Sequence, residues 1–289
     1  MKPVAFAIGA HPDDIEFRKA GTLRLLQQAG WEIHYLNIAN GCCGSTRHSA
    51  ATLRKMRAAE GRRAANILGA HFHPSFCNDM EIVYDLKSVR RLAAIIRKVQ
   101  PSIILTHPPA DYMEDHTNTC RLVVTAAFTR EMPNFRVTPA RRPYRGDVTI
   151  YHCVPHGLVD PLRRPMPPEF YVNTTSVHAV KQAALAEHRS QFEWLESSQG
   201  VASITQALDE SSRVVGQMSG RFQHAEGWWR HLHLGFSAED RDPLREVLGP
   251  LVRMASRPRT KNFTGETAGE TGGTPAPLQR LSKPNHRSK

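Results

Sequence analysis

The 289-residue sequence has few cysteines, no long apolar run and no internal repeat. Its five cysteines are an odd number without a Cys-x-x-Cys spacing, which argues against a disulfide scaffold and is typical of a reducing compartment. No segment approaches the roughly 20 apolar residues of a membrane span. The chain enters a strand-like segment almost at its N-terminus, so we expect no signal peptide. These features predict a cytoplasmic protein without a membrane span.

Motifs for nucleotides and nucleic acids are also missing. No Gly-x-Gly-x-x-Gly follows a strand-like segment, which argues against a dinucleotide cofactor. The net charge of +11 would suit a nucleic-acid-binding protein, but residues 251–289 carry eight basic and two acidic side chains, over half of the excess. This segment is rich in Gly, Thr, Pro and Ser, so we expect a basic, disordered tail after a single domain over 1–250. Without a helix-turn-helix, zinc finger or aromatic-basic pattern, we expect no specific nucleic-acid partner.

Strand-like and helix-like segments alternate along the chain. This alternation predicts parallel βαβ units and an α/β, Rossmann-like, doubly wound and mainly parallel sheet with helices on both faces. Strands are expected at 3–9, 32–39, 71–76, 102–106, 147–154 and 169–174. Helices are expected at 19–29, 49–68, 86–99, 115–129, 177–195 and 200–217.

A His-Pro-Asp-Asp tetrapeptide, His11 to Asp14, directly follows the first apolar run. Ligand sites of open α/β sheets form where strands end, which is where this tetrapeptide falls. Two adjacent carboxylates in a partly buried turn repel each other unless a cation neutralises them. The alternative is an ordinary turn in which Asp14 caps the next helix. The tetrapeptide alone does not decide between a site and a turn.

A second polar cluster follows the apolar strand at 102–106. Zinc is typically held by His nitrogen and carboxylate oxygen atoms, with three protein ligands at a catalytic site. The first and fourth strands of a doubly wound sheet are usually neighbours, so the two clusters should converge on one crevice. A solvated loop would explain the second cluster alone, but the pair together predicts a metal site. The cluster consists of His107, Asp111, Glu114, Asp115 and His116.

Five segments resemble the LmbE/PIG-L family of zinc-dependent N-deacetylases. AHPDDIEF (10–17) resembles the family's first signature, and THPPADYMEDH (106–116) resembles its second motif. Weaker similarities lie in RKMRAAEGRRAANILGA (54–70), VKQAALAEHRSQ (180–191) and QHAEGW (223–228). The resemblance covers roughly residues 1–235. It implies an enzyme that removes acetyl groups from N-acetylglucosamine units.

The resemblance implies a role for each residue of the two main motifs. His11, Asp14 and His116 would hold Zn2+, or another divalent ion. Asp13 would be the general base that activates the attacking water, a role open to it only while Asp14 alone binds the metal. Asp115 would assist catalysis by holding an imidazole in place.

Further positions are expected to contact the substrate. Arg57 and Asp79 match family positions that often contact the sugar. Many members carry a His three residues before the last ligand, where this chain has Met113. Another group must then stabilise the oxyanion or protonate the leaving amine, unless Asp13 shuttles the proton itself. The candidates are His107, Tyr112, His156 and His188.

The sequence therefore predicts a metal-dependent hydrolase whose partner is a small N-acetyl-sugar-type substrate. Met113 keeps open a catalytically idle binding protein, and the net charge of +11 keeps open a basic nucleic-acid-binding protein. Intact His11, Asp13, Asp14 and His116 argue against the first alternative. A homo-oligomer is compatible with the sequence.

Overall fold

The computed structural model describes residues 2–200 and 203–256. The strands are β1 (Val4–Gly9), β2 (Glu32–Asn37), β3 (His71–His73), β4 (Ile103–Thr106), β5 (Thr149–Cys153), β6 (Phe170–Asn173), β7 (Ala225–Arg230) and β8 (Val252–Met254). The helices are α1 (Asp14–Arg18), α2 (Ala20–Gln28), α3 (Ala50–Leu68), α4 (Leu86–Val99), α5 (Glu114–Phe128), α6 (His178–Leu185), α7 (Arg189–Gln199), α8 (Ile204–Met218) and α9 (Pro243–Leu248). Three 3-10 turns are η1 (Thr129–Glu131), η2 (Thr175–Val177) and η3 (Gly249–Leu251).

The strands form one eight-stranded sheet in the order β3-β2-β1-β4-β5-β7-β6-β8. The strands from β3 to β5 are parallel, while β7, β6 and β8 extend the sheet by antiparallel pairing. β1 pairs with β4, with Ala5 opposite Ile103, so the predicted neighbours are confirmed. The α/β, doubly wound fold is confirmed as a mixed sheet with a parallel half.

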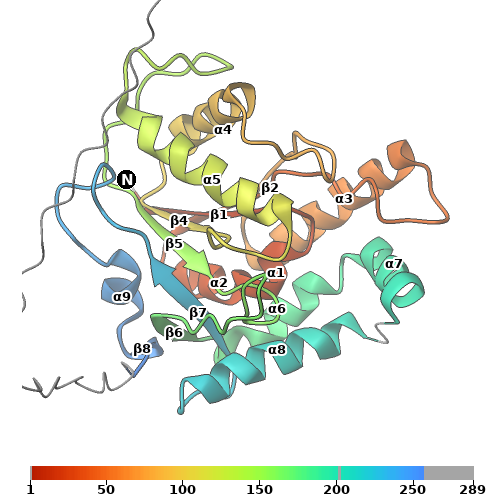
Figure 1. Ribbon diagram of the computed structural model, residues 1–289. Coiled ribbons are helices and arrows are strands. Elements are labelled where there is room, and N and C mark those ends of the chain that lie inside the picture. Colours follow the sequence, from red (N-terminus) through yellow and green to blue (C-terminus); the bar gives the residue numbers. More distant parts are fainter. Residues whose placement is uncertain (1, 201–202, 257–289) are drawn as a thin grey trace, which may run out of the picture. The chain divides into compact units, whose positions relative to one another are not determined.

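Helices cover both faces of the sheet (Figure 1). Ala5 and Ala7 of β1 belong to a core cluster with residues of α2, α3 and α6, whereas Phe6 and Ile8 pack with α4 and α5. Because both faces of β1 are buried, its sequence is a continuous apolar run rather than an alternating one. Burial on both faces also explains why the carboxyl ends of these strands are the accessible place for a site.

Local signals set the helix ends. Ser49 caps α3 by accepting a hydrogen bond from the backbone N–H of Thr52, and Gly69 ends it with φ of 78°. Asp85 caps α4 in the same way, through the backbone N–H of Ser88. The predicted helices over 49–68 and 86–99 are confirmed.

Two predicted boundaries were wrong. The helix expected over 177–195 breaks between α6 and α7, because the chain turns there to bury His188 and Ser190. The boundary expected between residues 250 and 251 is too early, because β8 pairs with β6 and the compact unit ends at Ala255. β8 is only three residues long and lies at the edge of the sheet, where it is largely exposed. Its sequence therefore has no apolar run that would predict a strand. The rest of the expected tail, residues 257–289, lies outside the described residues.

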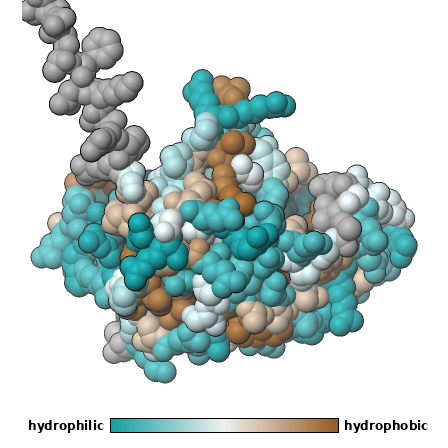
Figure 2. Space-filling model, turned by 90° about the horizontal axis from the view of Figure 1, so that it is seen from below, coloured by the Kyte–Doolittle hydropathy of each residue, from teal (hydrophilic) through white to brown (hydrophobic). Residues whose placement is uncertain are grey.

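The face shown in Figure 2 is mainly hydrophilic where its residues are described, with apolar side chains interrupted by polar ones. Within 2–200 and 203–256, no helix combines the length and apolar character needed to cross a bilayer.

Candidate metal centre and its cavity

A cavity of about 560 Å³ opens where β1, β4 and β5 end. Strand ends at a switch point of a parallel sheet are the usual place for a ligand site. The cavity brings together the two motifs, which lie almost 100 residues apart in the chain. Its polar lining includes His11, Asp13, Asp14, Arg18, Arg57, Asp79, His107, Asp111, Tyr112, His116 and His156, and its apolar lining includes Phe17, Met80, Met113, Trp194 and Leu195.

The first motif forms a tight turn between β1 and α1. Asp13 adopts φ of 119°, a left-handed conformation that costs a non-glycine residue energy and is common at functional sites. Asp14 begins α1, and its Oδ2 accepts hydrogen bonds from the backbone N–H groups of Ala10 (3.0 Å) and His11 (2.7 Å). The turn thus fixes the Asp14 carboxylate, while the Asp13 carboxyl takes no part in these hydrogen bonds.

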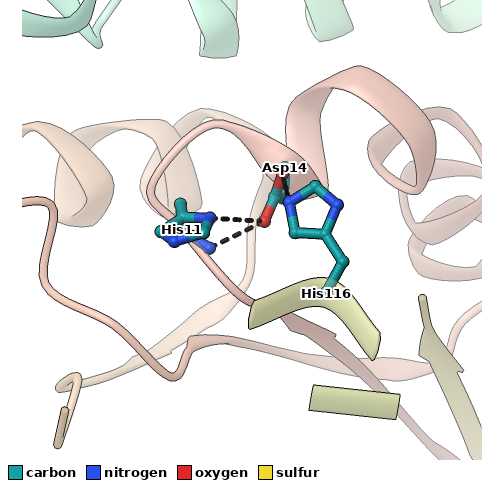
Figure 3. Close-up of side chains that lie close together, drawn as sticks. All are labelled: His11, Asp14 and His116. Atoms are coloured by element: carbon teal, nitrogen blue, oxygen red, sulfur yellow. Dashed lines mark hydrogen bonds and ion pairs between the residues drawn. The ribbon is translucent and has the colours of Figure 1, made fainter. Parts of the chain in front are cut away.

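His11 and His116 lie on opposite sides of the Asp14 carboxylate (Figure 3). His11 Nδ1 is 3.7 Å from Asp14 Oδ2, and His116 Nε2 is 3.3 Å from Asp14 Oδ1. Ligand atoms bound to one tetrahedral zinc lie about 3.3–3.5 Å apart. One candidate ligand atom from each residue lies within 4.8 Å of the other two. The donor set and its spacing therefore fit a divalent cation.

A carboxylate orients each imidazole from behind. His11 Nε2 contacts Asp115 Oδ2 at 2.8 Å, and His116 Nδ1 contacts Asp111 Oδ1 at 3.0 Å. Each contact leaves the other ring nitrogen facing Asp14. The sequence predicted that Asp115 would hold an imidazole, and the structure places it on His11. Asp111 was given no role from the sequence, although an acid five residues before the candidate ligand His116 in the same motif was a usable signal.

Electrostatics favour a positive charge at this place. Burial opposes ionisation of Asp14, but the imidazoles of His116 and His107 hold its pKa well below the usual range. Despite burial, Asp115 and Asp14 raise the pKa of His11 to about 10, and Asp14 and Asp111 raise the pKa of His116 to about 9. Both candidate ligand imidazoles thus attract a proton, in the position where a bound cation would replace it.

The neighbouring carboxyl of Asp13 behaves differently. Burial and the charge of Asp14 raise the pKa of Asp13 to about 7, while His188 and Arg57 act in the opposite direction. Two adjacent carboxyls thus have distinct environments, one anionic and committed to the imidazoles, the other free of side-chain hydrogen bonds among the described residues.

His107 lies inside the centre rather than at its edge. Its Nε2 accepts a hydrogen bond from the Ala10 backbone N–H at 3.0 Å and lies 3.2 Å from Asp14 Oδ2. Its ring stacks on His116 with centroids 4.1 Å apart. Burial, Lys19 and His116 lower the pKa of His107 to about 3, so this imidazole is neutral.

The other predicted contacts divide into two groups. Tyr112 lines the cavity with its ring edge-on to His116, and His156 lines it beside Phe17. The structure does not support the substrate contact predicted for His188. This residue is fully buried away from the cavity lining, with Nε2 3.4 Å from Glu16 Oε1. The turn between α6 and α7 places His188 next to the first motif, and no signal in the sequence predicted this turn.

Arg57 and Asp79 both line the cavity but are tied to one loop. Asp79 accepts hydrogen bonds from the backbone N–H groups of Gly41 (2.6 Å) and Cys43 (3.0 Å). Arg57 donates from Nη2 to the carbonyl of Gly44 at 3.3 Å. Gly41 has φ of 74°, and a Cβ there would lie 2.1 Å from Arg57 Cδ, so only glycine fits against the arginine. These contacts fix the loop that forms one wall of the cavity.

The three weaker motifs meet in buried pairs. Glu60 accepts hydrogen bonds from the backbone N–H (3.0 Å) and the hydroxyl (2.6 Å) of Ser190. Lys181 forms an ion pair with Glu226 at 2.8 Å, and Glu226 also accepts from backbone N–H groups at the start of α2. These segments therefore hold α3, α6, α7 and β7 around the first motif.

The chain is similar to known proteins in sequence and in fold. The family model for GlcNAc-PI de-N-acetylase (PIG-L) matches residues 6–127, which include both main motifs. A diacetylchitobiose deacetylase from Thermococcus kodakarensis is 30% identical over 192 residues, 64% of this chain and 68% of that protein. A 4-oxalmesaconate hydratase from Pseudomonas putida is 27% identical over 232 residues, 77% of this chain and 87% of that protein.

A solved structure has the same fold. The N,N'-diacetylchitobiose deacetylase of Pyrococcus horikoshii superposes with a TM-score of 0.66 at 24% identity, covering 83% of this chain and 88% of that one. The shared fold, the family match over both motifs and the 30% identical relative lead to one conclusion: this chain belongs to the PIG-L family.

Proposed function

We propose that this protein is a zinc-dependent N-deacetylase that removes an acetyl group from an N-acetylated amino sugar or its conjugate. One observation carries the proposal: His11, Asp14 and His116 converge with metal-ligand spacing, and the Asp13 carboxyl lies beside them in the same cavity. Relatives named as deacetylases of diacetylchitobiose and of N-acetyl-α-D-glucosaminyl L-malate support the choice of substrate class.

The residues of the cavity can perform each step of amide hydrolysis. A bound divalent ion would polarise the carbonyl and acidify water, which is the chemistry that an amide needs. Asp13 takes a proton from the attacking water and returns it to the leaving nitrogen. Asp111 and Asp115 keep the ligand imidazoles in one orientation throughout.

The position of Met113 determines which groups remain to stabilise charge on the substrate. Met113 lines the cavity and offers no proton. Tyr112 and His156 line the same cavity and carry polar hydrogens, and we assign the family role of the absent His to this pair. His107 is neutral and its Nε2 already accepts a hydrogen bond from the backbone N–H of Ala10, so we do not assign it this role.

Acetate release tests the proposal directly. Purified protein, stripped with chelator and reloaded with one equivalent of zinc, is incubated with N-acetylglucosamine, diacetylchitobiose and N-acetylglucosamine conjugates. We expect acetate and free amine in equal amounts, dependent on metal and abolished in His116→Ala. Metal-loaded, folded protein that releases acetate from none of these would refute the proposal.

Hydration is the second candidate, because the hydratase relative matches more of this chain than the deacetylase does. The same ligands and base could add water across a conjugated double bond. Consumption of 4-oxalmesaconate without acetate chemistry would favour this candidate. Because both named relatives are enzymes, a binding-only or nucleic-acid-binding role is not favoured.

A cytoplasmic location and a homo-oligomeric state stay predictions. Fractionation of the source cells tests the first, and light scattering on the purified protein tests the second.

A further inference from the structure

Arg18 is a buried cation in the wall of the cavity. It ends α1, is 8% exposed and lines the cavity within one helical turn of the first motif. Among residues 2–200 and 203–256, its guanidinium forms neither a hydrogen bond nor an ion pair, and its Nε is buried without a partner. Most buried charges in proteins are paired, because an isolated one is costly.

The nearest acids are committed elsewhere. Glu226 is held by Lys181 and by the backbone N–H groups of Gly21 and Thr22. Asp111 uses Oδ1 for His116, and within the part of the chain that the structure describes its Oδ2 forms no hydrogen bond, with Arg18 or any other residue. Burial lowers the pKa of Arg18, but a guanidinium stays protonated at neutral pH. The cavity therefore holds a permanent positive charge that forms no direct hydrogen bond or ion pair with any described residue.

We propose that Arg18 forms an anion subsite and that the substrate carries a carboxylate or a phosphate group which this guanidinium binds. The subsite deepens the proposed deacetylase function and rests on it for the identity of the rest of the substrate. A guanidinium offers a planar fork of donors that matches both anions in a bidentate manner. Ion pairing inside the cavity also makes the contact selective, because a neutral sugar leaves the charge unpaired.

A structural role for Arg18 makes a different prediction. If Arg18 served mainly to support Asp111 and the ligand His116, its loss would weaken metal binding and slow all substrates alike. If Arg18 forms an anion subsite, its loss instead raises the KM of substrates that carry the charged group. The effect of the same loss on a neutral analogue is smaller.

Binding of simple anions is the first test and does not depend on catalysis. Inorganic phosphate and malonate are titrated into chelator-treated protein, so that neither anion can bind through a metal. We expect wild type to bind at least one of them and Arg18→Met to bind it about 10- to 100-fold more weakly, the loss expected for a charged hydrogen-bonded pair. Arg136→Met is the matched control, because Arg136 is exposed on a loop and makes no side-chain hydrogen bond among the described residues.

Substrate ranking is the second test. Acetate release is compared for N-acetylglucosamine, its 6-phosphate and N-acetylmuramic acid, which carry no charge, a phosphate and a carboxylate respectively. We expect wild type and Arg136→Met to prefer one of the two anions, and Arg18→Met to lose that preference because its kcat/KM falls more for the anionic substrate than for N-acetylglucosamine. Arg18→Lys, which keeps the charge without the fork, should fall between them and guards against misfolding of the Met variant.

The outcomes separate the two proposals. Equal anion affinity in wild type and Arg18→Met, no binding of either anion to wild type, or the same substrate ranking in both would overturn the anion subsite, even if acetate is released. Absence of acetate release from all three compounds would overturn the deacetylase function, whereas Arg18-dependent anion binding would still establish the subsite.

Discussion

Asp111 Oδ1 lies 3.0 Å from His116 Nδ1, and this contact decides which nitrogen of His116 faces Asp14. An imidazole that donates Nδ1–H to a carboxylate presents an unprotonated Nε2, the form that binds a metal. Asp115 does the same for His11 through the opposite nitrogen. The two outer carboxylates are thus as much part of the candidate centre as the three proposed ligands, His11, Asp14 and His116.

The first prediction concerns this outer pair. Asp111→Asn keeps an acceptor for His116 but removes the negative charge that makes its imidazole a strong ligand. We expect metal affinity to fall by about 10- to 100-fold with the fold intact. Competition with a chelating dye measures the affinity, and Asp147→Asn, at an exposed acid, is the control. Unchanged affinity would remove Asp111 from the centre.

The second prediction concerns the ligands themselves. His11→Ala, Asp14→Ala and His116→Ala should each lose most of the bound metal, because two protein ligands hold a divalent ion far more weakly than three. Metal analysis after gel filtration gives the occupancy. His71→Ala, an exposed imidazole of β3, should keep the wild-type content. Full occupancy in any of the three variants would exclude that residue from the ligand set.

The third prediction separates the adjacent carboxyls. Asp13→Asn should keep its metal while kcat for acetate release falls by about 10²- to 10⁴-fold, since the amide cannot take a proton from water. Substrate affinity should change little. Should Asp13→Asn lose the metal while Asp14→Asn retains it, the two roles are exchanged. Full activity of Asp13→Asn would require another base.

The fourth prediction concerns stability. Lys181→Met leaves Glu226 charged and unpaired inside the protein, and we expect a loss of about 3–5 kcal/mol in the free energy of unfolding. The double variant Lys181→Met/Glu226→Gln should recover part of this loss, because it leaves no buried charge and the Gln amide oxygen can still accept from the backbone at the start of α2. Denaturant unfolding of the single and double variants measures both values. A loss in the free energy of unfolding of Lys181→Met well below this range would mean that water reaches the Lys181–Glu226 pair.

The same pair predicts a pH dependence. Burial raises the pKa of Glu226, but Lys181 and the hydrogen bonds of Thr22 lower it further, so the net shift is downward from 4.5. A depressed carboxyl pKa stabilises the folded state above the unfolded pKa, and this contribution disappears as pH falls through the folded pKa. Acid unfolding should therefore begin below about pH 4.5 and be less steep in the Lys181→Met/Glu226→Gln variant, which lacks this carboxyl. An equal slope in both proteins would contradict this assignment.

The fifth prediction concerns β8. A chain that ends at residue 250 lacks β8 and leaves the edge of β6 unpaired, so it should melt several degrees lower than a chain that ends at residue 256. Thermal unfolding followed by circular dichroism compares the two. Equal melting temperatures would show that the edge pairing adds no stability.

Much of the parallel half of the fold follows from sequence pattern alone. β1 is an apolar run because both faces are covered, and α3 and α4 have caps and stop residues that are local signals. Both main motifs could be recognised in the sequence because polar residues directly follow an apolar, strand-like run. A strand order that puts β1 beside β4 then made their convergence predictable.

Tertiary structure decided what local signals cannot express. His188 and His107 look alike in the sequence, yet one is buried against Glu16 and the other lies against Asp14 inside the cavity. Asp111 and Arg18 acquire their significance only from what surrounds them: the first has an imidazole within hydrogen-bond distance, and the second has no direct hydrogen-bond or ion-pair partner among residues 2–200 and 203–256. Sequence specifies residue types and their local geometry, whereas pairing, burial and an uncompensated charge depend on contacts between segments far apart in the chain.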